Sequence, residues 1–321
     1  MRVIAVVAAV VATIAGTAAW GSPLPPAKAC PLFPATNAWN RRVDTLPVAA
    51  ESGATVAAIG GAKTMHADFG SGLWNGGPIG IPITVVGKEQ RKSAVSFEYA
   101  DESDKGPYPI PPGVRIEGGV ASDGDRHALI VDRDACRLYE LYNLRRVGVR
   151  WTAGSGAIWN LRSNKLRPAG WTSADAAGLP ILPGLARYDE VSRGRIDHAL
   201  RFTVSRTRRA YDWPARHYAS SLTDPALPAM GARLRLKRDF DVTGFPRQSQ
   251  VVLRALKEFG MILADNGSDW YVSGVPDPRW SNDDLHTLGR VPGSAFEVVD
   301  TSSLRPRLLY QSSPMSVAPT R

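Results

Sequence analysis

The segment HALIVDRDACRLYELY, residues 127–142, decides the fold class of this chain. Two runs of strand-forming residues, 127–132 and 136–142, flank the short connection 133–135. Valine, isoleucine and tyrosine favour strands, and a three-residue connection is typical of a β-hairpin. Successive side chains of a strand alternate between its two faces, and the second run fits that alternation. The sequence therefore predicts an antiparallel hairpin here.

Four more segments are expected to be strands: 95–99, 198–204, 232–237 and 270–273. The chain has 25 prolines and 30 glycines spread along its length, which is typical of many short strands joined by turns. Helix patterns are few. The clearest covers 247–264, where apolar residues recur three and four positions apart. A short helix is expected at 172–177 and a short turn at 188–194.

These elements predict a mainly β fold: an antiparallel β-sandwich of the jelly-roll type with a few flanking helices. Other β-rich α+β arrangements fit the same pattern. A hydrophobic content of 44% indicates a substantial core, and no internal repeat divides the chain. We expect one β-rich domain over residues 30–300, followed by a flexible C-terminal tail, 301–321.

Residues 1–29 have the pattern of a cleavable secretion signal. Arg2 precedes an apolar run, 3–19, and small residues and prolines follow it. Cleavage is expected at Ala27-Lys28-Ala29 or in the Ala18-Ala19 region. The alternative is an uncleaved anchor, but the run is rich in alanine and weakly hydrophobic for a membrane span. We therefore expect a secreted protein, extracellular or periplasmic, without a stable membrane anchor.

Cys30 and Cys136 are the two cysteines of the chain. In an oxidising compartment two cysteines can pair, and this link would tie the N-terminal arm to the middle of the domain. Two free buried thiols are the alternative. A thiolate metal site is excluded because four closely spaced ligands are absent.

The formal net charge of +9 suggests acidic partners. For an exported protein these are an anionic polysaccharide, the cell wall or a membrane surface, and we expect no nucleic-acid partner. Arg233, Arg235 and Lys237 alternate along one expected strand, so they would project from one face and favour anionic glycans. The alternative is that the basic residues simply form solvated faces.

Familiar catalytic motifs are absent from the sequence. It has no Gly-x-Ser-x-Gly elbow, no His-Glu-x-x-His motif and no phosphate-binding Walker loop. A nucleotide-dependent enzyme or an acyl-transfer triad is therefore disfavoured, and no cofactor is expected.

Carboxylates in loops are the first candidates for chemistry. Glu190 and Asp175 lie in apolar-flanked segments that could desolvate them and raise their pKa values. Paired carboxyl groups hydrolyse glycosidic bonds, one as acid and the other as base or nucleophile. The alternative for each residue is a helix cap or a surface ion pair.

Histidine, aromatic and arginine side chains complete the candidate site. His198 and His217 are candidate bases, although a structural hydrogen-bonded role fits each of them too. Aromatic rings stack on sugar rings, and guanidinium groups bind hydroxyls and acids. The expected substrate-binding residues are Trp159, Arg162, Trp171, Tyr188 and Arg216.

Asp125 and His127 are alternative candidates for metal ligands, and one further histidine would complete the site. The sequence alone does not bring such residues together, so no metal is assigned.

Several strings together resemble a group of uncharacterised secreted bacterial proteins over about residues 33–300. They are HADFG (66–70), DESD (101–104), GPYPIP (106–111), GDRH (124–127), LYELY (138–142), WTSADAAGLP (171–180) and DNGS (265–268). The resemblance implies export and a single extended domain, and it implies no particular chemistry.

We expect a secreted, carbohydrate-active protein whose partner is a polysaccharide or cell-wall glycan. Glycoside hydrolysis is the preferred reaction. The alternatives are a polysaccharide lyase acting on an acidic glycan and a non-catalytic glycan-binding protein.

Overall fold

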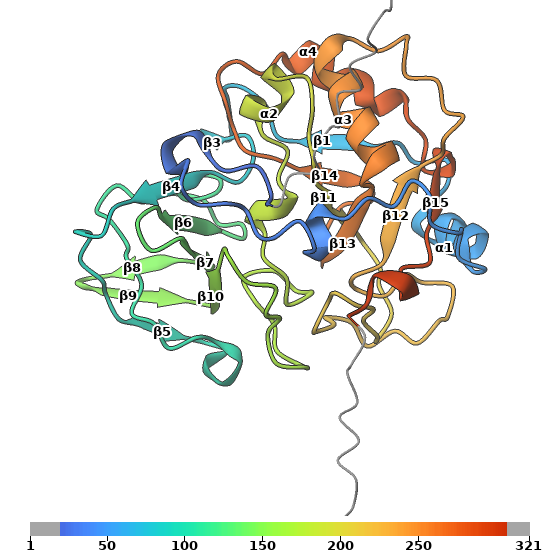
Figure 1. Cartoon of the computed structure of the whole chain (residues 1–321). Coiled ribbons are helices and arrows are strands. Elements are labelled where there is room, and N and C mark those ends of the chain that lie inside the picture. Colours follow the sequence, from blue (N-terminus) through green and yellow to red (C-terminus); the bar gives the residue numbers. More distant parts are fainter. Residues whose placement is uncertain (1–19, 307–321) are drawn as a thin grey trace, which may run out of the picture.

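The structure, a computed structural model, describes residues 20–306. It is mostly β, with several sheets and four α-helices, and it has no barrel (Figure 1). Two larger sheets lie in different parts of the molecule, a four-stranded one on the left of Figure 1 and a six-stranded one on the right. The chain segments that connect these two parts carry the candidate site described below.

The four-stranded sheet contains the expected hairpin. Its order is β10-β7-β6-β4, with β4 Ile83–Val86, β6 Ala128–Asp132, β7 Arg137–Tyr142 and β10 Ser155–Asn160. Strands β6 and β7 pair antiparallel, as predicted, whereas β4 and β6 pair parallel. All five residues of β6 are buried, so this strand is central to its part of the core.

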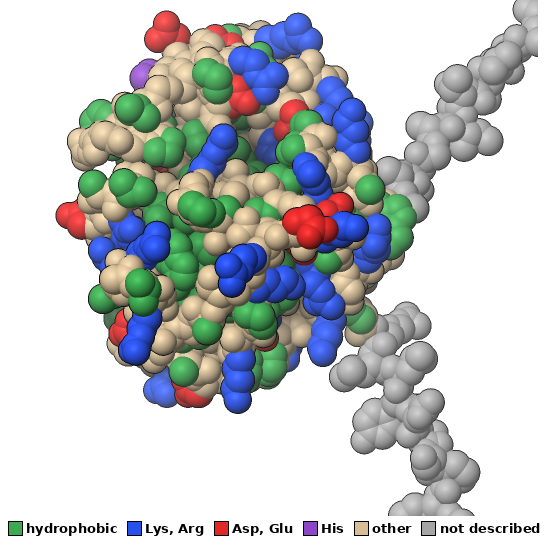
Figure 2. All heavy atoms as spheres, turned by 90° about the vertical axis from the view of Figure 1, so that its left-hand side faces the viewer, with side chains coloured by type: hydrophobic (Ala, Val, Ile, Leu, Met, Phe, Trp, Pro, Cys, Tyr) green, Lys and Arg blue, Asp and Glu red, His purple; other side chains and the backbone are tan. Residues whose placement is uncertain are grey.

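Two smaller sheets flank the four-stranded one. A three-stranded sheet has the order β5-β9-β8, with β5 Val95–Phe97, β8 Arg145–Val147 and β9 Arg150–Ala153. A two-stranded hairpin joins β2 Leu73–Trp74 to β3 Gly77–Pro78. The outer side of this region, viewed in Figure 2, carries basic side chains and apolar groups with fewer acidic ones.

The six-stranded sheet is mixed, in the order β1-β14-β11-β13-β12-β15. Parallel pairs join β1 to β14 and β11 to β13, and the other neighbours are antiparallel. The strands are β1 His66–Asp68, β11 Leu200–Val204, β12 Arg233–Leu236, β13 Met261–Asn266, β14 Tyr271–Ser273 and β15 Phe296–Val298.

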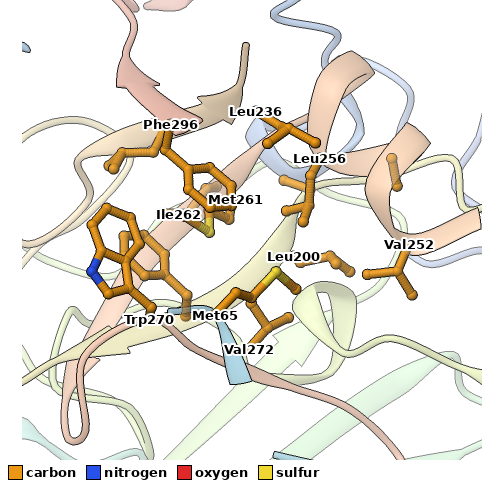
Figure 3. Close-up of a cluster of buried hydrophobic side chains, with 14 of the residues drawn as sticks. Met65, Leu200, Leu236, Val252, Leu256, Met261, Ile262, Trp270, Val272 and Phe296 are labelled. Atoms are coloured by element: carbon orange, nitrogen blue, oxygen red, sulfur yellow. The ribbon is translucent and has the colours of Figure 1, made fainter. Parts of the chain in front are cut away.

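Helix α3, Arg247–Glu258, packs on this sheet through one apolar side. Val252 and Leu256, one turn apart, share that side because helical neighbours lie three and four residues apart. Figure 3 shows them beside Leu200, Leu236 and other buried side chains of the strands. The remaining helices are α1 Ser52–Ile59, α2 Tyr188–Ser192 and α4 Asn282–His286, and short 3₁₀ turns occupy several connections.

The helix predicted over 247–264 ends at Glu258, so the prediction is wrong for residues 259–264. Gly260 has a φ of +66°, and a Cβ atom there would lie 2.2 Å from the Leu234 carbonyl oxygen, so glycine is required at this close approach. The apolar run that follows, 261–264, is buried in β13 between two neighbouring strands. Continuous apolar runs are typical of strands that are covered on both faces.

The other sequence expectations have mixed outcomes. The segment 188–194, expected to be a short turn, contains helix α2, whereas 172–177, expected to be a short helix, forms turns and no helix. The mainly β class is confirmed. The antiparallel jelly-roll sandwich is not confirmed, because parallel pairs occur in both larger sheets and a helix covers the six-stranded one. The tail 301–321 lies outside the described residues from 307 onward, and Ser302–Leu304 forms a 3₁₀ turn.

The predicted disulfide between Cys30 and Cys136 is present and ties the N-terminal arm to the start of β7. The arm packs from its first described residues: Trp20 bridges Pro34, and Leu24 and Ala27 are buried. The signal segment before residue 20 lies outside the described residues. Among residues 20–306, none of the helices combines the length and apolar character that a membrane crossing requires.

Candidate active site

A cleft of about 370 Å³ lies where the four-stranded sheet meets the end of β13. Tyr142 ends β7 on one wall, and Asp265 lies near the end of β13 on the other. A second cavity of about 380 Å³ near β15 is lined by Arg233 but by none of the predicted catalytic or substrate-binding residues. The polar and aromatic residues lining the cleft are Tyr99, Glu102, Asp125, Tyr142, Ser155, Thr172, Ser173, Asp175, His217, Asp265 and Asn266.

Asp175, predicted as a catalytic carboxylate, lies at the base of the cleft in a buried ion pair. Its two oxygens accept hydrogen bonds from Arg201 Nε (2.8 Å) and Nη2 (2.7 Å). Arg201 projects from β11, and its Nη1 donates to Ser273 Oγ at 2.7 Å. Burial alone would lower the pKa of Arg201, but Asp175 raises it and the net direction is upward. Arg201 therefore keeps its charge although it is buried.

Asp265 is the carboxyl group in the cleft with the most unusual environment. Burial and the adjacent negative charge of Asp175 raise the pKa of Asp265 well above its ordinary value. Arg201 only partly opposes this, since its Nη2 lies 3.4 Å from Asp265 Oδ2 while it binds Asp175 more closely. The Asp265 side chain keeps 20% of its surface exposed. It is therefore a carboxylic acid that can retain its proton and still be reached from the cleft.

His127 and Glu117 form a second buried pair beside the cleft. His127 Nδ1 lies 2.6 Å from Glu117 Oε2, and Nε2 lies 2.9 Å from the Ala174 carbonyl oxygen. Burial would lower the pKa of His127, but Glu117 raises it to about 9. Both ring nitrogens face acceptors, so both carry protons and the imidazole is a cation.

This pair bears on the alternative metal site. Ligand atoms of Glu117, Asp125 and His127 all lie within 4.8 Å of one another. A metal-bound imidazole must offer a nitrogen lone pair, whereas both His127 nitrogens are used as donors. The three residues do not fit a metal ion, and Asp125 is left as an exposed carboxyl group at the wall of the cleft.

Glu190 is buried as expected, but the predicted rise of its pKa is wrong. Its carboxylate lies 2.8 Å from Arg187 Nη2 and 3.0 Å from His198 Nε2. Burial would raise the pKa of Glu190, but these two neighbours outweigh it and the net direction is downward. Glu190 and His198 are not among the cleft-lining residues within 20–306. They form an internal ion-pair network that joins α2 to the segment before β11.

His217 does line the cleft. Its Nδ1 lies 2.8 Å from the Ala176 carbonyl oxygen, and its ring stacks on Tyr218 with the planes 2° apart. The remaining nitrogen, Nε2, lies 4.0 Å from Glu102. The structure thus brings together Asp175, His217 and Asp125 from the predicted set.

The five predicted substrate-binding residues do not line the cleft in the described chain. Trp159 is buried, and its indole N–H donates to Glu140 at 3.0 Å. Tyr188 packs edge-on against Trp280, and Arg167 lies over the ring of Trp171. The two arginines bind backbone carbonyls: Arg162 that of Ala29 and Arg216 that of Arg167.

The predicted basic strand face on β12 is not an exposed surface. Arg233 is buried and donates to the carbonyl oxygens of Ala38, Arg41 and Phe259, and burial lowers its pKa to about 9. Arg235 forms an ion pair with Glu297 at 2.8 Å. Only Lys237 of the three is exposed, so this face cannot present a row of three cations to a glycan.

Sequence reasoning missed Asp265 and Glu117 as site residues, together with Tyr99 and Tyr142 as aromatic cleft residues. A polar residue directly after a buried apolar run was the available signal for Asp265, in the string MILADN. Because a helix was expected to end in this string, Asp265 was not placed near the end of a strand. With this geometry established, comparison with known proteins found no matching family model, curated protein or solved structure.

Proposed function

We propose that this protein is a secreted glycoside hydrolase with its active site in the cleft. The observation that carries the proposal is the raised pKa of Asp265, a solvent-accessible carboxyl group beside the ionised Asp175. A carboxylic acid that keeps its proton near neutral pH can protonate the oxygen of a leaving group. Asp265 takes the role that the sequence suggested for Glu190.

The hydrolytic step needs a second carboxylate, and we assign it to Asp125 on the cleft wall. Asp265 donates its proton to the glycosidic oxygen as the bond from that oxygen to the anomeric carbon breaks. A water molecule attacks the anomeric carbon and loses its proton to Asp125. Asp175 and Arg201 do not transfer protons; the charge of Asp175 raises the pKa of Asp265, and Arg201 is bound mainly by Asp175 and so opposes this rise only in part.

The cleft lining favours neutral or cationic sugars over acidic ones. Four carboxyl groups line it, from Glu102, Asp125, Asp175 and Asp265, and no lysine or arginine of residues 20–306 does. A polysaccharide lyase requires a cation to neutralise the sugar carboxylate, and the nearby Arg201 is already bound by Asp175 and Ser273. The hydrolase therefore fits this cleft better than the lyase. Tyr99 and Tyr142 offer ring faces to a sugar, which a non-catalytic binder would also use.

Export is part of the proposal, supported by the disulfide and by the signal pattern. Residues 20–29 pack on the fold: Arg187 donates to the Ser22 carbonyl at 3.2 Å, and Leu24 is buried. Cleavage after Ala29 would remove these contacts, so the Ala18-Ala19 region is the better site. N-terminal sequencing of the exported protein is expected to begin near Trp20, and a chain that begins at Cys30 would contradict this.

The activity is tested with a panel of neutral, amino-sugar and acidic polysaccharides, scored for new reducing ends and for absorbance from unsaturated products. We expect reducing ends without absorbance. Asp265→Asn should lower turnover by about 10²–10⁴-fold, the usual contribution of a general acid. Asp239→Asn is the control, because Asp239 is exposed and forms no recorded ion pair within the described chain. Binding without cleavage would favour the glycan-binding protein, and an absorbing product would favour the lyase.

A further inference from the structure

The hairpin formed by β8 and β9 ends in six consecutive exposed residues, 145–150. Its tip carries two valines, Val147 at 62% exposure and Val149 at 88%, on either side of Gly148. Gly148 has a φ of +60°, which suits a tight turn. These aliphatic side chains contribute nothing to the core and are free to contact an external partner.

Three arginines surround these valines. Arg145, Arg146 and Arg150 are exposed, and none of them forms an ion pair with another residue of 20–306. Arg146 lies over the ring of Trp151, 5.7 Å from its centroid. The tip therefore combines unpaired positive charge with apolar groups, a combination that suits the interface of an anionic membrane, where cations meet headgroups and apolar groups reach the acyl boundary.

A second hairpin, formed by β2 and β3, also exposes large apolar side chains. Leu73 and Trp74 of β2 are 70% and 73% exposed, and the β3 label lies on the left of Figure 1, as do those of β8 and β9. The view of this side in Figure 2 shows apolar and basic side chains together, with few acidic ones. Tryptophan is enriched at membrane–water interfaces because its ring is apolar and its N–H is polar.

We propose that this side of the protein docks reversibly on an anionic lipid bilayer, with the 145–150 hairpin as the main contact. An anionic polysaccharide would pair with the arginines, but it offers no apolar phase for the valines and Trp74. An anionic bilayer uses both features. The inference does not depend on the hydrolase activity, because the hairpins are separate from the cleft-lining residues.

The test is co-sedimentation of the full mature chain with vesicles of phosphatidylcholine alone or mixed with phosphatidylglycerol. We expect binding to the mixed vesicles only, weakening as salt is raised. Each arginine near an anionic surface contributes roughly fivefold in affinity, so the triple variant Arg145→Gln/Arg146→Gln/Arg150→Gln should bind on the order of 100-fold more weakly. Val147→Ser/Val149→Ser should lose up to about tenfold through its apolar contacts alone.

The control is the triple variant Arg238→Gln/Arg247→Gln/Arg254→Gln, which removes the same charge from exposed positions in or near α3. Retained binding by this control supports the proposal. No binding of the wild type to anionic vesicles, or an equal loss in both triple variants, would overturn it. Equal competition by soluble alginate together with unchanged binding of the valine variant would assign the surface to polysaccharide and would also overturn it.

Discussion

Two carboxyl groups of this protein, Glu190 and Asp265, have opposite pKa shifts in closely related surroundings. Each has an arginine and a second ionisable group nearby, and burial raises the pKa of each. Glu190 lies 2.8 Å from Arg187, which also pairs with Asp189 at 3.2 Å, and 3.0 Å from His198, whereas Asp265 has only the more distant share of Arg201, which Asp175 holds more closely. The pKa of Glu190 is therefore lowered, and the pKa of Asp265 is raised.

The comparison teaches that the ratio of cations to carboxylates, rather than burial, separates a structural acid from a chemically useful one. Solvent access adds a second distinction. The Glu190 side chain is 1% exposed, while that of Asp265 is 20% exposed at the wall of a cleft. A buried ion pair with no access can contribute to stability and specificity of the fold but cannot meet a substrate.

Glu190→Gln should have the largest effect of the substitutions discussed here, a fall in the free energy of unfolding. The substitution removes the carboxylate that contacts the buried Arg187 and His198 and leaves Arg187 only Asp189 at 3.2 Å, and loss of one partner of a buried pair costs about 3–5 kcal/mol. Urea unfolding should show this fall in the free energy of unfolding. Turnover per folded molecule should stay at the wild-type value. A loss of turnover in fully folded protein would return Glu190 to the active site.

Glu117→Gln tests a third carboxylate of this protein, whose cationic partner is a histidine, His127. The pKa of His127 is about 9 in the folded protein against an ordinary 6.5, so the folded state holds its proton more tightly. The resulting stability is fully present below pH 6.5 and is lost as pH rises to about 9, a change of about 3 kcal/mol.

Unfolding curves at pH 6 and pH 9.5 measure this loss in the wild type. Glu117→Gln removes the charge that raises the pKa of His127, so most of the pH dependence should disappear from the variant. The same pH slope in both proteins would contradict the pairing.

Asp175→Asn should sharpen the comparison with a smaller effect. Removing the neighbouring charge frees Arg201 for Asp265, so the pKa of Asp265 should fall. The alkaline limb of the pH–rate profile depends on the protonated acid, and it should move to lower pH. An unmoved limb in active, folded variant would mean that Asp265 is not the acid.

Local patterns made part of the fold predictable. The β6–β7 hairpin follows from alternation and turn residues within sixteen positions, and α3 follows from its apolar spacing as far as Glu258. The error beyond it has a physical cause: the run 261–264 suits a buried helix or a buried strand equally well. The run forms a strand because it pairs with β11 and β12, which are distant in the sequence.

The candidate site was only partly predictable for the same reason. Asp175, His217 and Asp125 were found as polar residues in connecting segments, where sites usually lie. Their neighbours Arg201 and Glu117 come from other parts of the chain, and only the tertiary structure shows which carboxyl group is left without its own cation. For Glu190 the desolvation was predicted correctly, but the counterions Arg187 and His198 were not weighed against it.

The order of strands in the six-stranded sheet also governs how the chain can fold. Strand β1 at residues 66–68 pairs with β14 at 271–273, and β12 is completed by β15 at 296–298. The ribosome therefore releases nearly the whole chain before this sheet can close, and contacts of such long sequence separation form slowly. The hairpin of β6 and β7 is local and can form early. A chain that stays open until its last strand emerges is well suited to crossing a membrane unfolded, and expressed fragments that lack β14 and β15 would be left with unpaired strand edges.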